Sequence, residues 1–262
     1  MAYHSAKLSI HTIAVDGKTI PRDVFYSAPF KLMNFFETAS GGIEYMVMNA
    51  SAGIMAHDRY EIEICAGENS ALTLLPQSFE KIHKMDFGEA TRKSAITIEK
   101  NAFFKYLALP TIPFAASAFR ANTRIQLADM SSRLLYGEIV SCGRHLRKER
   151  FSYRHYKSCV DIILNEKMVC RDHSVFVPEQ MLMESIGLFE HYAYLANLFI
   201  YGFVLSESVL EAIKRICEDE QAEAGITPLL GGGYLIRLLN NHSEKLIELF
   251  SKITSYVAGE YQ

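Results

Sequence analysis

Short segments that alternate apolar and polar residues run through the first two-thirds of this 262-residue chain. In Tyr60–Ala66 (YEIEICA), Ile62 and Ile64 stand between Glu61 and Glu63, and a period of two is typical of a strand with one buried face. Similar segments, separated by turn residues, are predicted strands: Ala6–Ala14, Ala71–Leu75, Lys93–Lys100, Thr123–Leu127, Ser132–Val140, Arg147–Lys157, Cys159–Leu164 and Met168–Ser174. Strands at this spacing indicate a sandwich, a barrel or stacked sheets. We expect a mainly β fold of many short strands in stacked or helically arranged sheets.

In the last third of the chain, the spacing of the apolar residues changes from that of a strand to that of a helix. In Ser206–Glu220 and again in Leu235–Val257, apolar residues recur at helical spacing, and Gly231–Gly233 between them predicts a flexible break. We therefore expect about two α-helices in the C-terminal third. The predicted organisation is a β-rich body over residues 1–205 and a helical C-terminal segment over residues 206–262, packed on the same domain.

The composition limits the binding partners and the cellular compartment that we expect for this protein. A net charge of −3, from 27 basic and 30 acidic residues, argues against broad binding to nucleic acid or anionic lipid. The five cysteines are scattered without a C-x-x-C pair, which favours reduced thiols over a zinc ribbon. Met1–Ile10 lacks an apolar leader, and the longest uncharged apolar stretch, His191–Ser206, is shorter than the roughly 20 residues of a membrane span. We expect a cytoplasmic protein.

Motifs of enzyme chemistry are missing from the sequence. There is no G-x-S-x-G elbow and no G-x-x-x-x-G-K-[ST] phosphate loop. Nine histidines occur, but none at H-x-H or H-x-x-x-H spacing, so a compact metal site is not indicated. Weak, exchangeable ligation by scattered side chains stays open. These absences argue against a hydrolase.

The segment Gly143–Lys157 (GRHLRKERFSYRHYK) is the strongest local charge feature. Basic and aromatic residues interleaved on a strand can stack on bases and neutralise phosphates. The segment therefore offers an alternative function, an RNA- or small-ligand-binding module that uses residues 144–157. The same pattern fits a solvated strand face or a protein-docking surface.

Five segments, taken in order, resemble motifs of the urease accessory protein family UreD, called UreH in some bacteria. Three residues depart from the family pattern: His57 and Lys148 replace glycines before Asp58 and Glu149, and Pro76 precedes the third segment. The five segments are Ala28–Leu32 (APFKL), Gly53–Asp58 (GIMAHD), Gln77–His83 (QSFEKIH), Leu109–Phe114 (LPTIPF) and Gly143–Phe151 (GRHLRKERF).

The resemblance implies a β-rich maturation factor without enzymatic activity. Such a protein is expected to bind UreF, to recruit the GTPase UreG through UreF, and to dock on the urease apoprotein so that nickel is installed. It implies no tightly bound cofactor, with nickel as a transiently passing ion, and no nucleic-acid or membrane partner. The amphipathic helices expected after Ser206 are the first choice for the UreF surface.

Family models also describe a tunnel through the protein that nickel could follow. The resemblance suggests four residues of this chain as lining such a route: Asp58, Glu138, His83 and Cys142. For Arg144 and Glu149 two roles stay open, a buried structural pair or contact with the ion.

Overall fold

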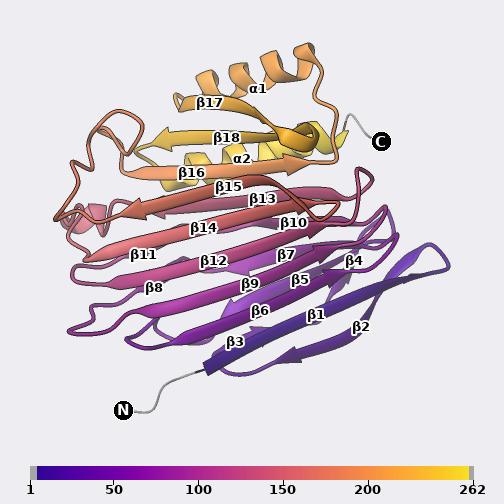
Figure 1. The fold of residues 1–262 in the computed structure, drawn as a ribbon, viewed down its shortest axis with the longest axis horizontal. Coiled ribbons are helices and arrows are strands. Elements are labelled where there is room, and N and C mark those ends of the chain that lie inside the picture. The colour runs from indigo at the N-terminus through magenta and orange to yellow at the C-terminus, as the bar shows by residue number, and fades with distance from the viewer. Residues whose placement is uncertain (1–4, 260–262) are drawn as a thin grey trace.

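The computed structural model describes residues 5–259, which form two large sheets that face each other (Figure 1). The seven-stranded sheet contains, in spatial order, β15 (Lys167–Phe176), β14 (His155–Leu164), β12 (Ala118–Leu127), β9 (Ala90–Ile98), β6 (Arg59–Ala66), β1 (Ser5–Val15) and β2 (Lys18–Tyr26). The main path of the 11-stranded sheet contains β17 (Glu223–Leu229), β18 (Gly233–Asn240), β16 (Tyr194–Tyr201), β13 (Arg133–Ser141), β10 (Phe103–Leu107), β7 (Ala71–Gln77), β5 (Ile43–Asn49) and β3 (Phe30–Leu32). Three short strands complete it: β4 (Phe36–Glu37), β8 (Glu80–Ile82) and β11 (Thr111–Pro113).

From β5 to β14 the chain passes back and forth between the two sheets, adding a parallel strand to each as it advances. The short strands β8 and β11 pair in parallel on a third side, and Ile54 extends this side through a bridge to Ile82. Antiparallel pairs close the two ends, for example β1 with β2 and β14 with β15. The prediction of a mainly β fold with helically arranged, stacked sheets is confirmed.

The strands form where the apolar face of an alternating segment can be buried. In β12, Ala121, Thr123 and Ile125 are buried between the sheets, while Arg120 and Arg124 face solvent. The predicted alternation of Tyr60–Ala66 gives the same result, because Ile64 is buried and Glu61 and Glu63 are exposed. A core of aliphatic and aromatic side chains fills most of the space between the sheets.

Two helices cover the outer face of the second sheet. Helix α1 (Glu207–Asp219) begins after Ser206, whose Oγ accepts a hydrogen bond from the Val209 amide at 3.3 Å. Helix α2 (Ser243–Gly259) buries its apolar face against β13, β16 and β18 (Figure 1). Both apolar faces are thus used inside the molecule, and polar faces are left for any partner.

Two local predictions are wrong. Residues 235–240 belong to strand β18 and do not start a helix, because both faces of the strand are covered. Leu235 and Leu239 face the space between the sheets, and Ile236 and Leu238 face the helices. Its continuous apolar run imitates helical spacing. The Gly231–Gly233 segment is the turn between β17 and β18, not a flexible break between helices. The described part of the predicted helical segment, residues 206–259, therefore holds two strands as well as two helices.

The predicted strand over Arg147–Lys157 is also wrong for most of its length. His145–Arg147 forms a 3₁₀ turn, and the strand β14 begins only at His155. Lys148 and Phe151 have left-handed φ values of 60° and 49°, which interrupt an extended chain. Within residues 5–259, no helix is long and apolar enough to cross a membrane.

Candidate functional site: a polar cavity between the sheets

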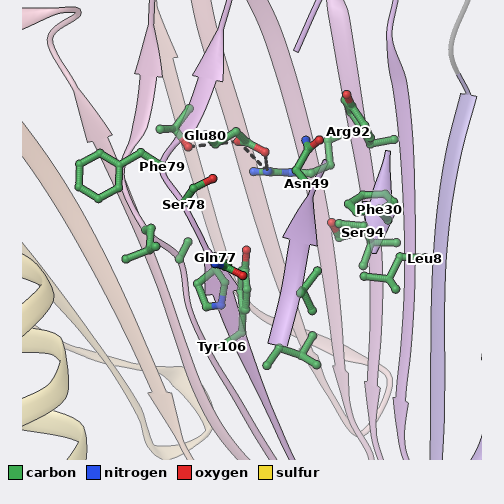
Figure 2. A pocket seen from close by; sticks show the side chains of 18 of the residues that line it. Leu8, Phe30, Asn49, Gln77, Ser78, Phe79, Glu80, Arg92, Ser94 and Tyr106 are labelled. Atoms are coloured by element: carbon green, nitrogen blue, oxygen red, sulfur yellow. Dashed lines mark hydrogen bonds and ion pairs between the residues drawn. The ribbon is translucent and has the colours of Figure 1, made fainter. Parts of the chain in front are cut away.

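A cavity of about 140 Å³ lies between the two sheets (Figure 2). Its lining includes the loop residues Ser51–Gly53 (the rim loop), Gln77 at the end of β7, and the following Ser78 and Phe79. Most of its wall is apolar, but the inner faces of the strands also bring charged and hydroxyl-bearing side chains to it, among them Tyr60, Glu80, Arg92, Tyr106, Tyr136 and Glu138.

Glu80 and Arg92 form an ion pair in the cavity wall, and Figure 2 shows them pointing toward one another. Arg92 Nη1 donates to both carboxylate oxygens at 2.8 Å, and Thr111 Oγ1 donates to Oε2 at 3.2 Å. The guanidinium also lies 5.5 Å from the centre of the Phe119 ring. Removing one partner of a pair this enclosed leaves the other charge uncompensated.

Three tyrosines, Tyr106, Tyr136 and Tyr156, surround this pair. Burial raises the pKa of each hydroxyl, that of Tyr106 to about 12. All three are therefore neutral at pH 7 and offer hydroxyl groups rather than charges.

Glu138 lies on β13 and carries the other carboxylate of the cavity wall. Tyr136 donates its hydroxyl to Oε1 at 2.7 Å, and Ser158 donates to Oε2 at 3.1 Å. Burial raises the pKa of Glu138, against the lowering effects of these two hydrogen bonds and of the positive charge of Arg92. No basic side chain among the described residues forms an ion pair with this carboxylate.

A second, smaller cavity of about 10 Å³ adjoins the first, and Glu138 and Tyr156 line both. Its far wall includes Asn197, whose amide donates to Asp172 at 3.2 Å. Arg237 donates to Asp172 at 2.7 Å and to Asn197 at 2.9 Å, with its side chain 41% exposed. A polar series of side chains thus leads from Glu138 toward the surface.

Asp58 does not line the cavity. It is buried, and its Oδ2 accepts hydrogen bonds from the Met55 amide at 2.8 Å and the Tyr60 hydroxyl at 3.2 Å. These contacts hold the turn before β6 and fix Tyr60, which does line the cavity. Asp58 acts on the cavity through that tyrosine.

His83 does not line the cavity but lies against the rim loop. Its Nε2 is 3.0 Å from the carbonyl oxygen of Ala52, and its ring is 4.9 Å from that of Phe114. Gly53 fits here because φ is 144° and a Cβ would lie only 2.8 Å from the imidazole. His83 therefore packs the rim loop against β8.

Cys142 is fully buried and lines neither cavity. Its Sγ is 3.6 Å from Arg150 Nη1, and burial raises the pKa of the thiol. The thiol is therefore protonated at neutral pH, and the thiolate is the form that binds metal.

Of the four predicted route residues, the structure brings only Glu138 to the cavity itself. Within residues 5–259, no group of three or more His, Cys, Asp or Glu side chains could hold a metal ion. Sequence reasoning missed Arg92, because the predicted strand began one residue later. Extending the alternation of β9 back from Ile96 and Ser94 would have placed Arg92 on the inner face.

Four of the five family-like segments meet along the third side of the body. The Ile54 amide donates to the Lys81 carbonyl at 2.8 Å, and the Phe114 amide donates to the Ile82 carbonyl at 2.9 Å. Arg144 pairs with Glu149 through Nε–Oε2 at 2.7 Å and a second contact between Nη2 and Oε1, and lies over the Phe114 ring. Arg144 and Glu149 therefore form a half-buried ion pair.

The family-model comparison matches residues 4–262 to the UreD urease accessory protein family. A urease accessory protein UreD from Acetivibrio thermocellus is 33% identical over 253 residues, which cover 95% of each chain. A urease accessory protein UreH from Helicobacter pylori strain P12 is 31% identical over 252 residues, which cover 96% of this chain and 94% of that protein. A UreD from Actinobacillus pleuropneumoniae serotype 3 is 31% identical over 261 residues, 95% of each chain. The resemblance predicted from five short segments is confirmed, and this chain belongs to the UreD family of urease accessory proteins.

Proposed function

We propose that this chain is a urease maturation factor. It binds UreF, recruits the GTPase UreG through UreF, docks on the urease apoprotein, and conducts nickel through its interior without catalysing a reaction. Membership of the UreD family supports the role in urease maturation. The observation that carries the nickel route is Glu138, a carboxylate that forms no ion pair with any described residue and lines two adjoining cavities between the sheets.

The chemistry of the cavity suits passage of an ion rather than storage. Glu138 is held by two hydroxyl groups, which donate to its oxygens and turn easily to make room for a cation. Nickel accepts oxygen and imidazole ligands, and its affinity for a site rises with the number of charged ligands. One carboxylate surrounded by neutral tyrosines binds the ion weakly enough to release it.

The RNA-binding alternative is not favoured by the geometry of residues 144–157. Tyr153 is buried, and Phe151 packs against Phe189 with ring centres 5.1 Å apart. Arg144 and Arg150 are engaged by Glu149 and Glu184. An exposed row of aromatic rings for stacking on bases is therefore absent from this segment.

Co-expression tests the proposed function. Urease subunits and the remaining accessory proteins are produced with and without this chain, and the nickel content and activity of purified urease are measured. We expect both to fall to the background of unassisted apoprotein when the chain is omitted. Unchanged nickel content and activity would show that the chain has no role in maturation. Co-purification with UreF in the same cells checks the partner separately.

A further inference from the structure

The cavity through which a cation is proposed to pass is lined by two basic residues, the exposed Lys81 and the more enclosed Arg92. Arg92 lies in its wall on β9 with its side chain 16% exposed, opposite Glu80 with 24% exposed. A guanidinium is always charged and repels a metal ion. Its presence in a metal route therefore needs a physical reason.

Glu80 and Glu138 are the two carboxylates that line the cavity, and their surroundings differ. Glu80 accepts two bonds from Arg92 and one from Thr111, so its charge is neutralised and its oxygens are occupied. Glu138 accepts only from hydroxyl groups. The carboxylate of Glu80 is therefore masked by Arg92, whereas the carboxylate of Glu138 is available to a cation.

Without the guanidinium, a cavity of about 140 Å³ would contain two available carboxylates. Affinity for a divalent ion rises with the count of charged oxygen ligands, and the attraction is stronger where water is excluded. Such a site would retain the ion that the protein has to deliver.

We propose that Arg92 is a positioning residue that masks Glu80 and thereby keeps the cavity from trapping nickel. This inference rests on the proposed function, since it explains how a route through the chain remains weakly binding. Arg92 sets the affinity of the route, and Glu138 supplies its carboxylate.

Nickel titration of the full chain in its complex with UreF tests the inference. Equilibrium dialysis with Ni²⁺ alone compares wild type, Arg92→Gln and Arg120→Gln. Arg120 is a matched control, because it pairs with Glu89 on the outer face of the same sheet with 45% of its side chain exposed. We expect Arg92→Gln to bind Ni²⁺ about tenfold more tightly, because it frees a second carboxylate, and Arg120→Gln to bind as wild type does. Equal affinity of Arg92→Gln and wild type would overturn the inference.

A double variant decides the question if Arg92→Gln alone fails to fold. Glu80→Gln/Arg92→Gln replaces the ion pair by two amides of similar shape. Since Glu80 is already masked in the wild type, the double variant is expected to keep the nickel affinity within about threefold. A loss of tenfold or more would show that Glu80 binds nickel despite Arg92, and would refute masking. Both results are independent of whether omission of the chain abolishes urease activation.

Discussion

Two residues that the resemblance placed at family glycines adopt backbone conformations that favour glycine. His57 and Lys148 have left-handed φ values of 67° and 60°. These conformations cost backbone energy in the turns before Asp58 and Glu149.

Lys148 allows a direct test of that cost. We expect Lys148→Gly to raise the free energy of unfolding by about 0.5 kcal/mol, since the relief of left-handed strain exceeds the added flexibility of the unfolded chain. Lys148→Val should lower it by about 1 kcal/mol, because a β-branched side chain fits this conformation poorly. Thermal denaturation of both variants gives the comparison, and equal stability of the two would contradict it.

Glu138 is expected to reduce stability while serving function. Burial raises its pKa in the folded state, so the folded protein favours the neutral acid, and ionisation destabilises the fold as the pH rises above the ordinary value of 4.5. Glu138→Gln should therefore be more stable than wild type at pH 7, and the difference should shrink as the pH falls below 4.5. Urea denaturation at pH 4 to 8 measures it; a variant less stable than wild type at pH 7 would show a structural role.

At the scale of the elements, the local residue pattern predicts where a strand lies better than it predicts which strands pair with it. The alternation of Tyr60–Ala66 identified β6, but its parallel neighbours β1 and β9 are set by pairing between distant segments. For β18 the pattern misled, because a strand covered on both faces has no alternation to detect. The candidate site was predictable only to the same extent. Glu138 was expected from the family resemblance, but its contact with Ser158 depends on how β13 faces β14 across the core, which local pattern does not determine.

The contact between β13 and α2 depends on a residue without a side chain. A Cβ on Gly137 would lie 2.6 Å from the Phe250 ring, so Gly137→Ala should lower the free energy of unfolding by about 1–3 kcal/mol. Gly225→Ala on β17 meets nothing within 4 Å and should change it by less than about 0.5 kcal/mol. Phe250→Leu in the Gly137→Ala background should restore part of the loss. Similar denaturation midpoints for the two glycine variants would exclude this packing.

At the scale of the whole molecule, the advancing strands enclose an interior that local contacts do not fill completely. The apolar core occupies most of the space between the sheets, and the polar cavities lie where Glu80, Arg92 and Glu138 interrupt it. The helices α1 and α2 cover the outer face of the 11-stranded sheet (Figure 1).

The most direct test of the proposed nickel route is the nickel content of urease matured with Glu138→Gln. The variant removes the available carboxylate but keeps its shape, and Glu61→Gln on the exposed face of β6 is the matched control. With both variants still co-purifying with UreF, we predict that Glu138→Gln lowers nickel per urease about tenfold and that Glu61→Gln leaves it unchanged. Full nickel loading by Glu138→Gln would contradict a route through this cavity.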